Sequence, residues 1–103
     1  MDGVIAKARA IGPVVVVPEK TRIALQARMS FAALTVRPSW VDGHVVLARR
    51  LESPRFTRIE TYSPRNHLHG FRLRAPDEVD DEFGAWLAEA YDVGMQRHLG
   101  RRG

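Results

Sequence analysis

The chain has 103 residues, no cysteine, and 16 basic against 12 acidic residues, for a formal net charge of +4. This length suits one modest core, so we expect a single domain spanning residues 1–103. The lack of cysteine excludes disulfides, thiolate metal sites and cysteine nucleophiles. No stretch approaches the roughly 20 apolar residues that cross a bilayer, and the first residues lack a signal-peptide pattern. We therefore expect a cytoplasmic protein with no membrane partner.

Residues 2–11 are predicted to form a short helix. Val4, Ile5, Ala8 and Ile11 recur at helical spacing and form one apolar stripe. Gly12-Pro13 should end the helix, because proline disfavours helical geometry in the residue before it. An isolated helix of this length is marginal in water, so it must dock on another element.

Between residues 13 and 74 the pattern changes to strands. Ile23 and Leu25 alternate with Arg22 and Gln26, which is the period of a half-buried strand. Asp42-Gly43 is interpreted as a bulge or tight turn within a strand. Short connections favour antiparallel neighbours, because a parallel return needs a longer crossover. The expected strands are 14–17, 21–28, 29–37, 40–48, 56–62 and 67–74.

The C-terminal helix has the clearest boundaries. Asp77 is the expected N-cap after Pro76, and acidic residues crowd the first turns, where the helix dipole favours negative charge. Arg97 and His98 stand towards the other end, and residues 97–103 are expected to fray. The fold class is α+β: a mostly antiparallel sheet of five or six strands, packed by this helix and the short N-terminal one. The expected core residues are Leu25, Phe31, Val45, Leu47, Phe71, Leu73, Phe83, Trp86 and Leu87.

The order of several short segments resembles an uncharacterised, mainly bacterial family known as domain of unknown function 5655. The resemblance runs from Ile11 to about Gly94 and implies a compact α+β domain, found alone or at the C-terminal end of longer chains. It implies no established activity. The segments that carry it are Lys20-Thr21-Arg22-Ile23-Ala24, Met29-Ser30-Phe31-Ala32, Arg49-Arg50-Leu51, Ser53-Pro54-Arg55-Phe56, His69-Gly70-Phe71-Arg72-Leu73, Asp80-Asp81-Glu82 and Glu89-Ala90-Tyr91.

The leading functional hypothesis is a non-enzymatic binding module with an arginine-bearing sheet face. Of the 16 basic residues, all but Lys7 and Lys20 are arginine, whose guanidinium matches phosphate geometry. An arginine-rich composition also follows from a GC-rich genome, and polar residues on the open side of an antiparallel sheet are ordinary. The expected partner is an anionic ligand or nucleic acid. The candidate residues are Lys20, Thr21, Arg22, Arg28, Arg58 and Arg72, with Arg74 beside them and Tyr62 and Trp40 as stacking surfaces.

The alternative is a small metal-dependent or hydrolase-like enzyme. His67 and His69 lie two apart on one strand and so share a face, and His44 is a possible third ligand. A histidine beside Phe71 and Leu73 is as easily explained as a core-edge residue with hydrogen bonds. No nucleophile elbow, phosphate loop or dinucleotide fingerprint is present, so we expect no cofactor. A short first helix that leaves apolar surface uncovered would favour a homodimer.

Overall fold

The computed structural model describes residues 2–95; the expected frayed tail, with Arg97 and His98, lies outside this range. The chain forms an α+β domain, as predicted, with a six-stranded sheet in which all neighbours are antiparallel. The strand order is β1-β2-β3-β4-β6-β5. The elements are α1 (Asp2–Ile11), β1 (Val15–Pro18), β2 (Ile23–Gln26), β3 (Ser30–Val36), β4 (Val41–Leu47), β5 (Phe56–Ser63), β6 (Asn66–Leu73), the 3-10 turn η1 (Pro76–Glu78) and α2 (Asp81–Gly94).

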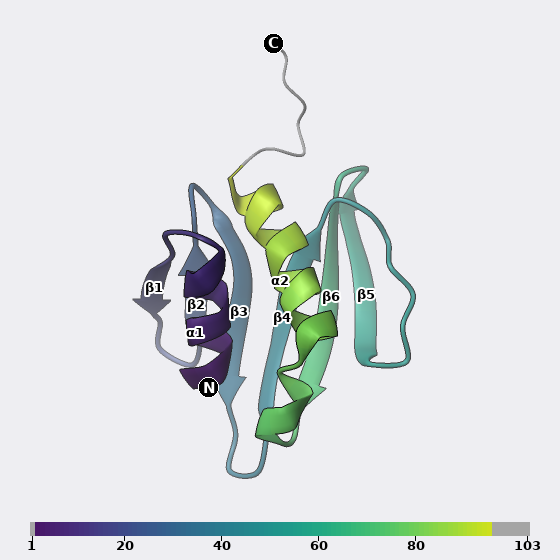
Figure 1. Cartoon of the computed structure of the whole chain (residues 1–103). Helices are drawn as coiled ribbons and strands as arrows, with labels where there is room; N and C mark the ends of the chain where they lie inside the picture. Colours follow the sequence, from purple (N-terminus) through teal and green to yellow (C-terminus); the bar gives the residue numbers. More distant parts are fainter. Residues whose placement is uncertain (1, 96–103) are drawn as a thin grey trace.

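Both helices lie on the same face of the sheet (Figure 1). Val4 and Ala8 of α1 and Phe83 and Leu87 of α2 are fully or almost fully buried there. The helical stripes predicted from the sequence therefore face the sheet, except for Ile11, which is exposed at the end of α1. All nine expected core residues are buried. The opposite face, which we call the open face, carries no helix among residues 2–95. None of the helices in this range is long and apolar enough to cross a membrane.

The start of α2 differs from the sequence-based expectation. The N-cap is Asp80, whose Oδ1 accepts a hydrogen bond from the backbone N–H of Phe83 at 2.9 Å, so the prediction of Asp77 was wrong. Asp77 falls instead within η1. The side chain of Glu78 binds the backbone N–H groups of Arg74 and Ala75. These bonds close a separate turn before the chain extends again and the helix begins.

Two features of the sheet decide which residues share a face. The strand β4 pairs with β3 and β6 without interruption through Asp42 and Gly43, so the expected bulge there is absent. A shift in register does occur between Leu25 and Gln26. Because β2 ends at Gln26, Arg28 lies in the turn that follows and does not continue the face that carries Arg22.

Candidate anion-binding site

One row of cross-strand neighbours on the open face has small residues on either side of His44. Ala24, Ala33, His44, Gly70 and Arg58 are paired in register on β2, β3, β4, β6 and β5. Paired residues of antiparallel strands project from the same side of the sheet. Because glycine and alanine flank the imidazole, the sheet surface sinks at this point. The result is a hollow of about 340 Å³ whose floor includes Ala33, His44 and Gly70.

Four arginines line this hollow, and each comes from a different part of the sheet. Arg22 precedes β2, Arg37 follows β3, Arg58 lies on β5 and Arg72 on β6. Asp42 is the one acidic residue among the described lining residues. The arrangement therefore gathers positive charge from segments that are far apart in the sequence.

Asp42 organises one side of the hollow. Its Oδ1 accepts a hydrogen bond from Nε of Arg72 at 2.8 Å, and its Oδ2 accepts from the indole N–H of Trp40 at 3.0 Å. Nε of Arg37 reaches the same oxygen at 3.4 Å. These contacts, the bond from Arg72 above all, lower the pKa of Asp42. The guanidinium of Arg72 also lies 4.5 Å from the centre of the Trp40 ring, so Trp40 is partly covered and offers less stacking surface than expected.

The other two arginines are held in the same manner. Nε of Arg22 binds a carboxylate oxygen of Glu19 at 2.6 Å, and Nε of Arg58 lies 2.9 Å from a carboxylate oxygen of Glu60. Their side chains nevertheless remain half exposed, at 50% and 60%. Ion pairs at this exposure contribute little to stability, but they restrict where the guanidinium groups lie.

The terminal Nη groups distinguish these arginines from those that support the fold. Arg49 uses both Nε and an Nη to bind Glu89, and Arg55 uses both its Nη groups, towards Asp80, Glu82 and the carbonyl of Glu78. For Arg22, Arg37, Arg58 and Arg72, the closest carboxylate contact is at Nε. Their Nη groups donate no hydrogen bond to any residue between 2 and 95. They are therefore available to an external acceptor.

His44 lies at the centre of the hollow and is half-buried. Burial, with the charges of Arg22 and Arg58, lowers the pKa of its imidazole from 6.5 to about 4, while Glu60 opposes this change. Neither ring nitrogen has a hydrogen-bond partner within the described part of the chain. At neutral pH the ring is thus uncharged and offers one donor and one acceptor.

Gly70 allows Arg58 to cross its strand. A Cβ atom built at position 70 would lie 3.0 Å from Cγ of Arg58 and 3.1 Å from Oγ1 of Thr57. Both distances are tighter than ordinary van der Waals contact. A side chain here would therefore raise the floor of the hollow and displace Arg58 from it.

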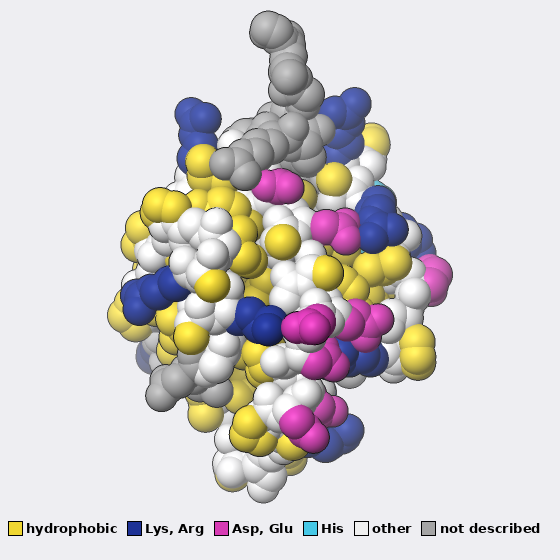
Figure 2. All heavy atoms as spheres, in the orientation of Figure 1, with side chains coloured by type: hydrophobic (Ala, Val, Ile, Leu, Met, Phe, Trp, Pro, Cys, Tyr) yellow, Lys and Arg dark blue, Asp and Glu magenta, His cyan; other side chains and the backbone are white. Residues whose placement is uncertain are grey.

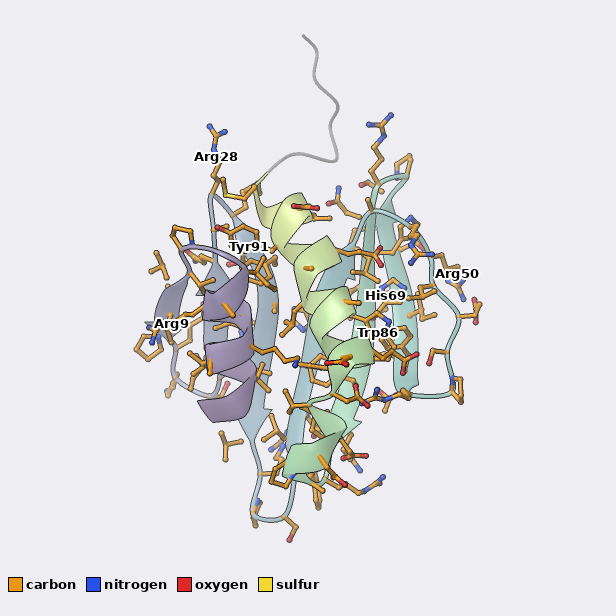
Figure 3. All side chains as sticks on the ribbon, viewed as in Figure 1. Arg9, Arg28, Arg50, His69, Trp86 and Tyr91 are labelled. Atoms are coloured by element: carbon orange, nitrogen blue, oxygen red, sulfur yellow. The ribbon has the colours of Figure 1, made fainter. Side chains whose placement is uncertain are left out.

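The structure brings together only part of the predicted site. Arg22, Arg58 and Arg72 line the hollow, whereas Lys20, Thr21 and Arg28 do not. Figure 3 shows Arg28 pointing away at one end of the molecule. Arg74 lines a smaller hollow of about 310 Å³, which shares Arg72 with the first. Tyr62 is exposed, and its hydroxyl donates to Glu60 on the same strand.

Sequence reasoning missed Arg37 and Asp42 as part of the site and assigned His44 a different role. Arg37 adjoins Pro38 and was expected at the end of a strand, and Asp42 was interpreted as part of a turn. The signal that would have found them is the register between β3, β4 and β6, which places Thr35, Asp42 and Arg72 in one row. That row cannot be written down until the strand order is known.

The histidines do not converge. His69 has no exposed surface and lies with Trp86 on the helix-covered side (Figure 3). Its Nε2 accepts the backbone N–H of Leu51 at 2.9 Å, and its Nδ1 lies 2.9 Å from the carbonyl oxygen of His67. Both ring nitrogens of His67 are also within hydrogen-bond distance of partners, Thr61 and Pro64. His44 projects from the opposite face, and no group of three metal-ligating side chains occurs between residues 2 and 95.

Acidic residues are concentrated near the C-terminal helix. Seven of the 12 acidic residues lie between positions 77 and 92. Figure 2 shows acidic side chains gathered over the first half of α2, beside a few basic ones. The hollow of the open face, in contrast, is lined by four arginines and one described acidic residue, Asp42.

Fold and site together define a class of protein: a small α+β domain whose antiparallel sheet is covered by helices on one face and hollowed on the other, with arginines round the hollow. The family model for "Domain of unknown function (DUF5655)" matches residues 1–94. The chain belongs to this family, as the resemblance indicated. No curated protein and no solved structure matches the chain significantly.

Proposed function

We propose that this domain is a non-enzymatic module that binds an anionic ligand in the hollow of its open face. The observation that carries the proposal is the set of four arginines that line one depression, with their Nη groups unpaired within residues 2–95. Guanidinium groups are weakly hydrated and remain charged at all relevant pH values, which suits them to anion recognition. Because carboxylates hold these arginines at Nε, less side-chain entropy is lost when the ligand binds.

The shape of the site favours a small anion over a nucleic acid. Glu19, Asp42 and Glu60 interrupt the basic surface at the rim of the hollow. Among the described residues, the open face presents no run of exposed aromatic side chains, since Trp40 is partly covered by Arg72 and Tyr62 lies on the edge strand β5. Proteins that bind single-stranded nucleic acid usually present a continuous basic groove with aromatic side chains on which the bases stack. A compact hollow suits a single charged group better.

The test is an NMR titration of the protein with sulfate, pyrophosphate and citrate, with backbone amide shifts as the readout. We expect shifts around Ala33, His44 and Gly70, and an apparent affinity that falls as sodium chloride is raised. The double variant Arg22→Gln/Arg58→Gln should lose at least about tenfold in affinity, since a hydrogen bond to a charged group contributes about 1.5–3 kcal/mol.

The matched control is Arg9→Gln/Arg50→Gln, which removes the same net charge. Arg9 lies on α1, and Arg50 projects from the loop before β5 (Figure 3). This variant should bind as the wild type does. No binding of any of the three anions, or equal losses in both double variants, would refute the proposal. The proposal would also be refuted if an oligonucleotide bound and shifted amide signals outside the hollow, while the small anions shifted no signal in the hollow.

A further inference from the structure

The arginines round the hollow come from different parts of the sheet. Their placement favours some classes of anion over others. We infer that the bound group is a terminal phosphate, a tetrahedral dianion, and that His44 takes up a proton when it enters. The inference rests on the proposed anion-binding function and specifies its ligand class.

The arginines surround His44 from several parts of the sheet, which suits a tetrahedral group. The strand β4, which carries His44, lies two strands from β2 and two strands from β5. Arg22 and Arg58 therefore reach His44 from opposite sides, and both lie close enough to lower its pKa. Arg72 and Arg37 stand on a third side, around Asp42. A carboxylate presents two oxygens in one plane and is satisfied by a single guanidinium fork. A terminal phosphate presents three oxygens in three directions, so it can engage all these sides at once.

The neutral imidazole offers one N–H donor, and protonation adds a second donor and a positive charge beside the bound anion. The charged groups that face it are Asp42 on its own strand, Arg37 after β3, Arg72 on β6, Arg58 and Glu60 on β5, and Arg22 before β2. Without a ligand, the field of the arginines and partial burial oppose a charge on the ring. A dianion among the arginines cancels that field and accepts a hydrogen bond from the ring. Both effects favour imidazolium, so binding of the anion and of the proton reinforce each other.

The experiment follows the His44 ring proton signals by NMR between pH 4 and pH 8, with and without saturating sulfate, at constant ionic strength. Sulfate is the probe for proton uptake because its own charge does not change in this range. We expect the pKa of His44 to rise by at least about one unit with sulfate. Sulfate affinity should rise by up to about tenfold per unit of falling pH between the free and bound pKa values. In His44→Gln this pH dependence should disappear, while Arg9→Gln should keep it.

The ligand class is tested at pH 7 with inorganic phosphate, glycerol phosphate, dimethyl phosphate and acetate. Phosphate and glycerol phosphate should bind at least about tenfold more tightly than acetate or dimethyl phosphate, because only they present a terminal tetrahedral dianion. A phosphoserine tetrapeptide distinguishes the source: tighter binding than glycerol phosphate supports a protein-borne phosphate, and weaker binding supports a small metabolite. Anions that bind the hollow with an unchanged His44 pKa, or acetate that binds as well as phosphate, would overturn the inference alone. Failure of all these anions to bind would overturn the proposed function as well.

Discussion

At the scale of single residues, the candidate site depends as much on what is missing as on what is charged. The arginines reach the centre of the sheet because Ala33 and Gly70 leave space beside His44. On most antiparallel sheets the polar face is filled by long side chains that pair with one another across strands. Here the row contains small residues, so Arg58 at one end of it, and the arginines that flank it, have space to line the hollow. The shape of the site therefore has a sequence basis that is separate from its charge.

This separation predicts that Gly70→Ala weakens anion binding without a change in net charge. The new Cβ would crowd Cγ of Arg58 and Oγ1 of Thr57, at 3.0 and 3.1 Å. Arg58 is half exposed and can move outward, so the fold should be retained, with a loss of stability of at most about 1 kcal/mol. We expect sulfate affinity to fall by about three- to tenfold in the NMR titration.

The control for this substitution is Gly3→Ala. Nothing lies within 4 Å of a Cβ atom built at Gly3, which is on α1. Alanine is favoured over glycine in a helix by up to about 1 kcal/mol, so this variant should be no less stable than the wild type and should bind sulfate equally well. Equal affinity in Gly70→Ala and the wild type would show that the depth of the hollow is irrelevant.

At the scale of elements, the loop between β4 and β5 ties α2 to the sheet. Arg49 forms a two-pronged pair with Glu89 in α2, and the backbone N–H of Leu51 donates to the buried His69 on β6. Arg55 stands over the Trp86 ring at 5.0 Å and binds the acidic residues at the start of α2. Several segments that carry the family resemblance meet here. The contacts of these segments with α2 and β6 indicate that the segments stabilise the fold.

We predict that Arg55→Gln lowers the free energy of unfolding by about 1–2 kcal/mol. The substitution removes a charged partner of Asp80 and Glu82, the hydrogen bond to the Glu78 carbonyl and the contact with Trp86. Arg50→Gln is the matched control, because Arg50 pairs with Glu52 in solvent and should cost less than about 0.5 kcal/mol. Urea denaturation measures both. Equal effects of the two substitutions would contradict a clamping role for this loop.

The elements themselves were largely predictable from the sequence, whereas their arrangement was not. The period of two on β2 and β6 and the apolar stripe of α2 identified the faces that are buried. The short connection indicated that β6 pairs with β5, but nothing local showed that β6 would also pair with β4. The physical reason appears in burial: β6 has buried residues on both faces, including Leu68 and Phe71, while β5 keeps Arg58, Glu60 and Tyr62 in solvent. The hollow depends on this strand order. The sequence therefore pointed to Arg22, Arg58 and Arg72 as candidate residues, but not to the small residues that form the floor of the hollow.

At the scale of the whole molecule, histidines that the fold keeps uncharged make stability depend on pH. Burial and nearby arginines lower the pKa of His44 from 6.5 to about 4, and burial also lowers the pKa of His69. As pH falls below 6.5, these histidines bind protons in the unfolded chain but remain unprotonated in the folded chain. The free energy of unfolding therefore decreases. His44 contributes at most about 3 kcal/mol between pH 6.5 and pH 4, since each pKa unit corresponds to about 1.4 kcal/mol.

The carboxylates act in a lower pH range. Interactions with Arg72, the N–H of Arg74, the N–H of Phe83 and Arg49 lower the pKa values of Asp42, Glu78, Asp80 and Glu89, respectively. Their stabilising contribution is complete above their unfolded pKa values of about 4 and disappears as pH falls further. A loss of stability between pH 6.5 and pH 4.5 therefore reports mainly the two histidines.

We predict that urea denaturation shows a steady loss of stability from pH 7 to pH 4.5, and that His44→Gln reduces this loss because glutamine does not titrate. His69 should account for what remains, since its buried Nε2 can accept the hydrogen bond from the backbone N–H of Leu51 only while the ring is uncharged. Sulfate should also reduce the loss in the wild type, because a bound anion lets the folded chain accept the proton at His44. A wild type as stable at pH 4.5 as at pH 7 would show that His44 is charged in the fold. The arginines would then not surround it as described.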